Sequence, residues 1–595
     1  MESAQKFKKI CANPALLPSA VIYAKVNTKE ERTERPMTKR IVSIVLALMM
    51  VASLCACSST AGTPAATNDA PATAAPEATS NATAEQTQQE IESLEADEIT
   101  YPLDTDAKFT YALETATQVT SRFTSLSDTP FAKALMEQTG VEVDYQFLLD
   151  KQAFSLMFAS GELADIICYD FIKNYAGGIE QAIKDNVIVP LNDYMEYAPD
   201  FFATLTRNDL WLKACKTSKG DFYGFPMVMD DTNTFLQVTN GAVIRDDWCR
   251  DLGIELPTTP SEVKNMLTLF RDEKGATVPF SYNDLFANGY FTAPFGVGYE
   301  LWYHNDGTVQ YGAYTQEIKN VYLYLADLYA EGLIDPNWVT VDSDTYRSNF
   351  MNGKSGMLFR NLNGGIATFI QTMRNDENPD WSCTGGPYLV ADELAGTDAV
   401  PMCGYLKNPV GTTITVVTSS CKDVETAVKF LNYGFTEAGD LLYNFGVEGE
   451  SFNFVDGTPT YSEYIMENPN GLTTQEAMAE YTRAWTNGPF VQGLEYGKQY
   501  NFRLPEQMTA VENWARTDAQ NHFMDYISIG AEDASEFANI MSEIETYVDE
   551  MQIKFVNGEL DIEENFDSYL ETLKSMNIER AIELKQNALN EFNAR

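Results

Sequence analysis

The sequence has little histidine and little positive charge. Its 595 residues include 2 His, and 41 Lys and Arg stand against 86 Asp and Glu, which gives a formal net charge of −45. Two histidines argue against a His-rich zinc site and against a relay of several histidines. The excess of acid argues against nucleic acid as a partner and against a polybasic hold on anionic lipid, because both surfaces are themselves negative.

Catalytic motifs are also missing. The G-x-S-x-G, H-E-x-x-H, P-loop and protein-kinase patterns do not occur. The 9 Cys include no C-x-x-C pair, so zinc-ribbon and thioredoxin-type chemistry lack support. Carboxylate pairs of the kind a glycosidase needs arise by chance among 86 acidic residues and decide nothing. We therefore expect no enzyme activity, no cofactor and no bound metal.

Apolar and aromatic residues, in contrast, are plentiful. Hydrophobic residues make up 44% of the chain and aromatic residues 12%, which is enough for large cores and excludes wholesale disorder. Six cysteines follow position 57, and we expect them to be isolated buried thiols, with disulfides as the alternative. The aromatic side chains are the most obvious resource for binding a ligand.

A short segment near the amino terminus predicts export. Lys39 and Arg40 precede an apolar run at 41–53 that is too short to span a bilayer as a stable helix. Leu54-Cys55-Ala56-Cys57 follows, and this order resembles a bacterial lipoprotein signal, in which the last Cys is lipidated. We predict a signal peptide at 37–56 and lipidation at Cys57. The alternatives are a plain secretory signal and a short transmembrane anchor.

The segments on either side of this signal are not expected to fold. Residues 1–36 precede the signal and are mixed and polar, so we interpret them as a mis-called extension, with Met37 as the true start. Residues 57–106 are rich in Ala, Thr and Pro, and no Lys or Arg occurs between 58 and 100. Such a stretch cannot bury enough apolar area to offset the loss of chain entropy. It is typical of a disordered tether that holds a domain away from a membrane.

The remainder of the chain begins as an alternation of strands and helices. We predict strands at 109–112, 141–148 and 164–168 from their apolar patterns. We predict one helix at 129–139 and a second that begins near 151 and ends at 160. Each is followed by a glycine that ends it. Strands that alternate with helices indicate βαβ units and a largely parallel sheet, so the fold class is α/β.

Six segments follow the lipoprotein signal in a set order. They are SGELADII at 160–167, FYGFP at 222–226, VIRDDWCRDLGI at 243–254 with PTT at 257–259, LYAEGLIDP at 328–336, FMNGKSGM at 350–357 and NFGVEGE at 444–450. No single segment is specific, but together and in this order they resemble the extracellular solute-binding proteins of carbohydrate ABC importers, in particular the large lipoprotein branch.

This resemblance implies a periplasmic-binding-protein-like fold of two α/β lobes, with a hinge and a ligand cleft between them. Lobe 1 would take 107–229 with a return near 405–460, and lobe 2 would take 230–404 continued by the mostly helical 461–595. The implied function is capture of a sugar or oligosaccharide and its delivery to the permease of an ABC importer. We expect a monomer on the extracellular face of the cell membrane, anchored through Cys57. An oligopeptide-binding lipoprotein and a secreted polysaccharide-degrading enzyme are the alternatives.

One segment departs from the family pattern. Many relatives carry an Asp- and Asn-rich calcium loop where this chain has FRDEKGATVP at 270–279. Too few oxygen ligands remain there for a six-to-eight-coordinate ion, and Lys274 adds a repelling charge. We therefore expect no calcium at this loop.

Candidate ligand contacts are aromatic and polar side chains near predicted strand ends, because sugars stack on aromatic rings and bond to planar polar groups. Asp170 also suits a helix N-cap, Trp248 a core position beside an Arg245–Asp247 ion pair, and Arg360 a surface salt bridge. Trp302 is the preferred aromatic, since it follows a glycine-containing loop. The full set is Tyr169, Asp170, Trp248, Trp302, Arg360, Asn361, Trp381, Tyr405 and Glu448.

Overall fold

The computed structural model describes residues 88–89, 91, 98–114, 117–148, 150–230, 235–298, 302–402, 404, 406–524, 527–530 and 532–595. The predicted extension 1–36, the signal at 37–56, Cys57 and most of the tether 57–106 lie outside these residues. Tyr405 and Cys403 also lie outside them. Within the described ranges, no helix has both the length and the apolar character needed to cross a membrane.

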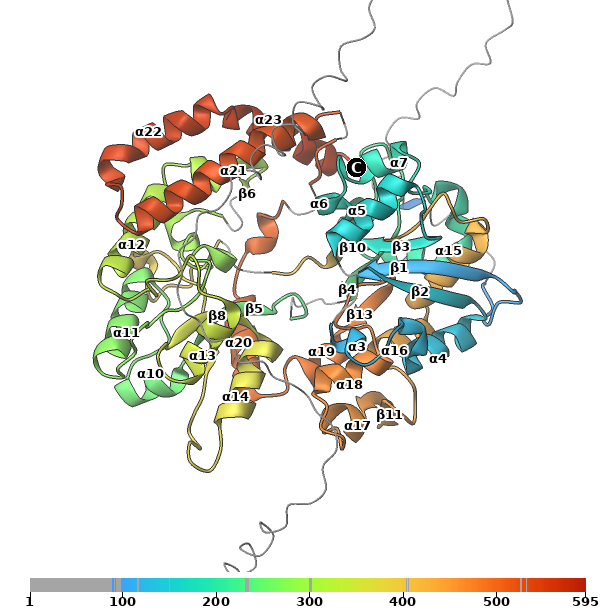
Figure 1. Ribbon diagram of the computed structural model, residues 1–595, viewed down its shortest axis with the longest axis horizontal. Coiled ribbons are helices and arrows are strands. Elements are labelled where there is room, and N and C mark those ends of the chain that lie inside the picture. The colour runs from blue at the N-terminus through green and yellow to red at the C-terminus, as the bar shows by residue number, and fades with distance from the viewer. Residues whose placement is uncertain are drawn as a thin grey trace, which may run out of the picture. The chain divides into compact units, whose positions relative to one another are not determined.

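A six-stranded sheet forms the centre of the first lobe (Figure 1). Its order is β13-β4-β10-β3-β1-β2. β1 is parallel to β2 and β3, and β13 is parallel to β4, whereas β10 runs antiparallel to both of its neighbours. The strands are β1 (Lys108–Glu114), β2 (Glu142–Leu148), β3 (Ile166–Tyr169), β4 (Phe225–Asp230), β10 (Val410–Val417) and β13 (Phe490–Gly493).

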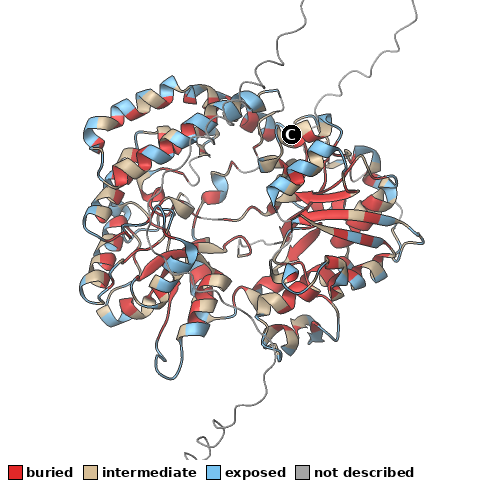
Figure 2. Cartoon of the chain, in the orientation of Figure 1, coloured by how far each residue is buried: buried red, intermediate tan, exposed pale blue. Residues whose placement is uncertain are grey.

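Local sequence explains the elements that begin this lobe. In β1, Phe109, Tyr111 and Leu113 belong to one core, while Ala112 belongs to a second core on the other face. Both faces of the sheet are therefore buried, as the red strands in Figure 2 show. Helix α4 (Pro130–Thr139) begins at the N-cap Thr129 and ends at Gly140, whose φ of 74° is left-handed. The strands and helices predicted in this region are thus confirmed.

Further helices of the first lobe cover the two faces of the sheet and its edges. They are α3 (Thr117–Thr120), α5 (Lys151–Ser160), α6 (Phe171–Asn174), α7 (Gly178–Lys184), α8 (Pro199–Leu205), α9 (Asp209–Ala214), α15 (Val424–Asn432), α16 (Glu437–Phe445), α17 (Glu463–Met466), α18 (Thr474–Tyr481) and α19 (Leu494–Tyr500). A hairpin of β11 (Phe452–Val455) and β12 (Thr458–Tyr461) precedes α17.

The second lobe is built on a different sheet. Its three strands, β5 (Asn240–Ile244), β8 (Met357–Asn361) and β9 (Thr384–Gly385), have the order β8-β5-β9. Both pairings are antiparallel. The largely parallel sheet predicted from the start of the folded region does not extend to this lobe, whose strands come from distant parts of the chain and are not joined as βαβ units.

Helices and one hairpin surround this second sheet. The hairpin joins β6 (Trp302–Asn305) to β7 (Thr308–Tyr311). The helices are α10 (Asp246–Leu252), α11 (Pro260–Asp272), α12 (Ile318–Ala330), α13 (Ser343–Met351), α14 (Thr368–Met373), α20 (Pro505–Ala515), α21 (Ala534–Val556), α22 (Ile562–Ser575) and α23 (Ile578–Asn593).

The chain passes between the lobes in several places. It leaves the first sheet after β4 and enters the second at β5, returns between β9 and β10, and leaves again after β13. The first two crossings touch each other, since Lys407 N donates to Gln237 O over 2.7 Å. The third crossing is tied to the second lobe where Asn363 Nδ2 donates to Asn501 Oδ1 over 2.6 Å.

Two segments depart from the predicted lobe boundaries. Residues 461–493 were expected in the second lobe, but Tyr461 and Ile465 are buried in the first core, and β13 pairs with β4. Helix α23 belongs to both lobes. Ile578 lies in the second core, whereas Leu589 lies in the first.

The guanidinium group of Arg245 is buried in the second core between two tryptophan rings. The Arg245 guanidinium lies 4.4 Å from the ring centroid of Trp248 and 4.6 Å from that of Trp381. Its Nε and Nη2 donate to the two carboxylate oxygens of Asp247 over 2.8 and 2.6 Å. The predicted ion pair is confirmed, and the two tryptophans hold it between their rings.

The described cysteines are free thiols, and the loop at 270–279 is held by ion pairs. Cys168, Cys215, Cys249, Cys383 and Cys421 are buried free thiols, as expected. In the loop, Lys274 Nζ lies 2.7 Å from Asp251 Oδ2, and Arg271 Nε lies 2.7 Å from Asp272 Oδ1. In the part of the chain that the structure describes, no group of three or more His, Cys, Asp or Glu is placed to hold a metal ion.

Replacement of Arg245 tests the buried pair. Arg245→Met leaves the Asp247 carboxylate, which is only 12% exposed, without its cation. We expect the free energy of unfolding in urea to fall by about 3–5 kcal/mol. Lys108→Met is the matched control, because Lys108 and Glu142 are 68% and 62% exposed and their pair contributes less than about 1 kcal/mol. Equal effects of the two changes would contradict this interpretation.

Candidate functional site

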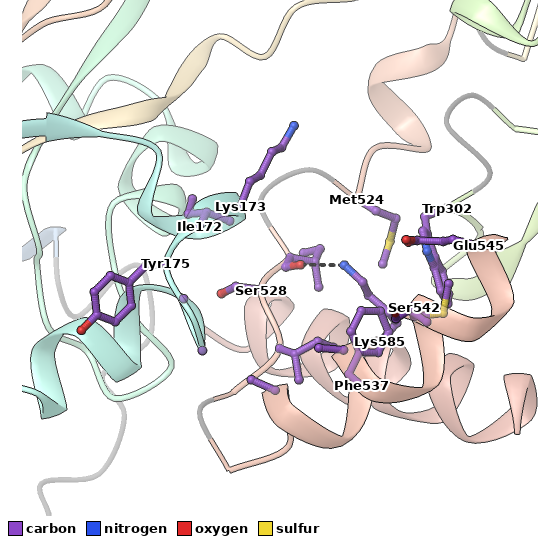
Figure 3. A pocket seen from close by; sticks show the side chains of 17 residues that line it. Ile172, Lys173, Tyr175, Trp302, Met524, Ser528, Phe537, Ser542, Glu545 and Lys585 are labelled. Carbon is purple, nitrogen blue, oxygen red and sulfur yellow. Dashed lines mark hydrogen bonds between the residues drawn. The ribbon is translucent and has the colours of Figure 1, made fainter. Parts of the chain in front are cut away.

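A pocket of about 620 Å³ lies between the lobes. Its first-lobe wall comes from α6 and the turn into α7, including Ile172, Lys173 and Tyr175. Its second-lobe wall comes from β6, α21 and α23, together with Met524 and residues 527–529. Figure 3 shows Ile172 and Tyr175 on one side and Trp302, Phe537 and Lys585 on the other. The volume is within the range of pockets that hold small organic ligands.

Trp302 is the predicted contact that lines this pocket. Its ring is packed at the back by Tyr311, with ring centroids 4.8 Å apart, and by Phe537 at 5.9 Å. Lys585 Nζ lies 5.8 Å from the Trp302 ring centroid and donates to the carbonyl of Ile527 over 3.1 Å. The indole is therefore a partly buried platform that is held in place before any ligand arrives.

Polar groups around this platform are few. Ser528 and Ser542 supply hydroxyls, and Glu545 supplies a carboxyl group whose pKa is raised by burial and by the nearby charge of Asp549. On the first-lobe side, burial and the hydrogen bond to Asp185 raise the pKa of Tyr175 to about 12. An apolar and aromatic surface with a small number of polar groups is the usual chemistry of a ligand pocket.

Tyr169 and Asp170 lie immediately before this wall. Tyr169 is buried and stacks on Phe154, with ring centroids 4.3 Å apart. Asp170 Oδ1 accepts from Lys173 N over 2.9 Å as the N-cap of α6, and Oδ2 accepts from Thr412 Oγ1 over 2.9 Å. Both carboxylate oxygens are therefore engaged within the lobe. The pair positions α6 at the end of β3, and α6 in turn lines the pocket.

The other candidates do not line the interlobe pocket. Trp248 and Trp381 are 8% and 6% exposed and enclose Arg245 in the second core. Glu448 is exposed on the turn before β11. These positions give the three side chains packing or surface roles, and the structure does not bring them together with Trp302.

Arg360 and Asn361 occupy a separate place, at the end of β8 beside the start of β5. Arg360 Nη1 donates to the Tyr346 hydroxyl over 3.4 Å. Arg360 Nε and Asn361 Oδ1 are buried and have no hydrogen-bond partner among the described residues. A π-helical turn (Leu362–Ala367) follows directly, a feature that recurs at functional sites. Both residues remain candidates for contact with a ligand.

Sequence reasoning missed most residues of the pocket. Phe537, Glu545 and Lys585 lie on α21 and α23, in a region predicted only as mostly helical. Met524 and Ile527 come from an irregular loop. The buried face of α21 carries a helical apolar repeat that could have marked it as packed, but no local signal distinguishes a pocket wall from a core.

The only two histidines of the chain meet beside this wall. His304 follows Trp302 on β6, and its backbone N–H donates to His522 O over 3.3 Å. His522 Nδ1 lies 2.8 Å from His304 O, and His522 Nε2 lies 3.5 Å from Asp518 Oδ2. Burial, together with the proximity of His522, lowers the pKa of His304, although Asp306 opposes this shift. These contacts fasten the strand that carries Trp302 to the loop that carries Met524.

Two α/β lobes that are joined by crossing segments, with a ligand-sized pocket lined from both, define a protein that binds a solute between its lobes. The family model of the bacterial extracellular solute-binding proteins matches residues 123–440, which is more than half of the chain. The chain belongs to this family.

Curated relatives and solved structures agree with this assignment. Lipoprotein LipO of Bacillus subtilis is 24% identical over 59% of this chain and 69% of its own length. The fructooligosaccharide ABC transporter substrate-binding protein FusA of Streptococcus pneumoniae serotype 4 is 23% identical over 77% of this chain and 86% of its own. The structure of the alginate-binding protein AlgQ2 matches with a TM-score of 0.64 at 19% identity, covering 83% of this chain and all of that one. At such identity the structural match shows the shared fold.

The lowered pKa of His304 predicts that the folded protein loses stability in mild acid. The folded-state pKa of His304 is lowered, so below about pH 6.5 the unfolded chain takes up a proton that the folded chain refuses. The contribution of His304 to stability is therefore lost as pH falls through this window. We expect the midpoint of urea unfolding to fall less between pH 7.5 and 5.5 in His304→Gln than in the unaltered chain. Parallel pH profiles for the two proteins would contradict this assignment.

Proposed function

We propose that this protein is the substrate-binding component of a carbohydrate ABC importer. The carrying observation is Trp302, a partly buried indole that is fixed by Tyr311 and Phe537 and lines the pocket between the lobes. A sugar ring presents a face of C–H groups that packs on an aromatic ring, while its hydroxyls bond to polar groups at the rim. Ser528, Ser542 and Glu545 line the same pocket and can supply such polar groups.

The ligands for which the relatives are named favour a saccharide over a peptide. FusA is named for fructooligosaccharide, and a Bacillus subtilis relative, 22% identical over 39% of this chain, is named for polygalacturonan and rhamnogalacturonan. An HMO-binding solute-binding protein of Bifidobacterium longum infantis, associated with an ABC transporter, shares the fold with a TM-score of 0.67 at 16% identity. The volume of about 620 Å³ lies within the range of pockets that enclose one ligand of drug size.

The mechanism that we propose is capture without chemistry. The lobes admit the saccharide, Trp302 stacks on it, and closure about the crossing segments encloses it. The closed surface is then recognised by the permease subunits in the membrane. We propose further that Cys57 carries a lipid that anchors a monomer to the extracellular face of the membrane, with the tether 57–106 as the spacer.

Ligand panels test the class of substrate. We expect thermal unfolding of the chain to shift upward with at least one neutral or acidic oligosaccharide and with no peptide of an oligopeptide panel, because a ligand that binds only the folded state stabilises it by RT ln(1 + [L]/Kd). Chromatography of the recovered saccharide should show it intact. New reducing ends would indicate a hydrolase, and a shift with peptides alone would indicate an oligopeptide-binding protein.

Substitution of Trp302 tests the platform. Trp302→Ala should weaken binding of that oligosaccharide, measured by titration calorimetry, by about tenfold or more, which corresponds to about 1.4 kcal/mol. Glu448→Gln is the control, since Glu448 is exposed and does not line the pocket. Unchanged affinity in Trp302→Ala, with an unchanged thermal midpoint, would place the saccharide elsewhere.

Substitution of Cys57 tests the anchor. In the host bacterium, Cys57→Ser should move the protein from the membrane fraction to the culture medium or the cell wall fraction, because the acyl chains are attached to this sulfur. Cys55→Ser keeps the lipidated position and is expected to remain in the membrane fraction. Retention of Cys57→Ser in the membrane would indicate an uncleaved transmembrane anchor instead.

A further inference from the structure

A second cavity, of about 290 Å³, shares the lining residue Ile527 with the interlobe pocket. Trp211 on α9 and Met229 on β4 line it from the first lobe, and His304 lines it from the second. Gln237 and Pro409, in the two crossing segments that touch each other, also line it. Ile527 is the one described residue that lines both cavities, so the second cavity is adjacent to the interlobe pocket but has its own lining.

Among the residues that the structure describes, the lining of this cavity carries no Asp, Glu, Lys or Arg, although the chain has a net charge of −45. Against this part of the lining a charged ligand would lose its hydration without meeting an opposite charge, which disfavours it. The lining instead combines aromatic rings with carboxamides. The rings are those of Trp211, Phe523 and Phe592, and the carboxamides are those of Asn208, Gln237, Gln520 and Asn593.

Trp211 supplies an unused hydrogen-bond donor at this lining. Its side chain is only 5% exposed, and its indole Nε1 is buried without a hydrogen-bond partner among the described residues. His304 Nδ1 is likewise buried and without a partner in that part of the chain. A buried polar atom is costly to leave unpaired, so the Trp211 donor and the His304 ring nitrogen favour an occupant that carries hydroxyl groups, which both donate and accept.

We propose that this cavity is a second binding site, which takes one neutral sugar ring. This inference rests on the proposed function, because the same chain must then meet saccharides. Aromatic faces suit the C–H surface of the ring, and carboxamides both donate to and accept from its hydroxyls. The volume is just below the range for drug-sized ligands and equals about ten water molecules, which suits a single ring and excludes a long oligosaccharide.

Because of its position, occupancy of this site affects how the two lobes are arranged. Its walls belong to both lobes, to the two touching crossing segments and to Leu589 of α23, the helix that is shared by both cores. A ring bound there contacts elements that must shift relative to one another when the lobes close. Its occupancy therefore favours the arrangement of the crossing segments that the structure shows.

Calorimetric titration with free monosaccharides tests this site. The probes are glucose, galactose, mannose and fructose, with glucuronate and galacturonate as charged counterparts. We expect at least one neutral sugar to bind with one-to-one stoichiometry and neither uronate to compete with it. Trp211→Phe, which keeps an aromatic ring and removes the donor, and Gln237→Met should each weaken that binding tenfold or more. Glu448→Gln is the control, and thermal midpoints establish that each variant is folded.

The outcomes separate this site from the proposed function. If the unaltered chain binds oligosaccharide but no neutral monosaccharide, or binds uronate as tightly, the second site is overturned and the proposed function stands. Monosaccharide binding that Trp302→Ala abolishes and that Trp211→Phe and Gln237→Met leave unchanged also overturns it, by assigning the ring to the interlobe pocket. Failure to bind any saccharide overturns both proposals.

Discussion

The main constraint on this molecule is that one chain must serve two separate cores. The strands of the first sheet come from positions as far apart as 108 and 493, and the second sheet is inserted between β4 and β10. The apolar side chains of the first passage are divided between the two cores, since Leu236 packs in the first core and Val238 in the second. The passages fix how the lobes face each other, and the pocket walls belong to elements on both sides of them. Because α23 also contributes to both cores, a change in the relation of the lobes must be accommodated in these shared elements.

Polar contacts join the crossing segments at specific points. Asn363 accepts from Gln507 over 3.0 Å and donates to Asn501 over 2.6 Å, so the third crossing is tied to the turn after β8. Arg360 and Asn361 end β8 at that turn, and the unpaired atoms of these two residues lie close to the junction. The final helix adds a mechanical link, since Lys213 Nζ on the first lobe donates to Asn593 O over 3.3 Å. Two candidate contact residues and a crossing segment are thus contiguous in the second lobe.

Sequence patterns predicted the beginning of the first lobe well, because caps, glycine stops and alternating apolar residues act locally. Thr129, Gly140 and Gly161 bound α4 and α5 as expected. The patterns failed where partners are distant in the chain. The antiparallel second sheet, the return of 461–493 to the first lobe and the enclosure of Arg245 by two tryptophans all depend on pairings that no local pattern encodes. Trp302 was predicted as a contact because a local glycine-containing loop precedes it. Lys585 and Trp211 were not predicted, because their neighbours in the cavities are distant in the chain.

The central claim is that a saccharide is held between two lobes that close on it. Small-angle X-ray scattering of the full chain, with and without an oligosaccharide that raises its thermal midpoint, tests this claim most directly. The account predicts a smaller radius of gyration at saturating ligand and no change with a sugar that does not bind. A radius of gyration that stays constant while calorimetry shows stoichiometric binding would contradict it.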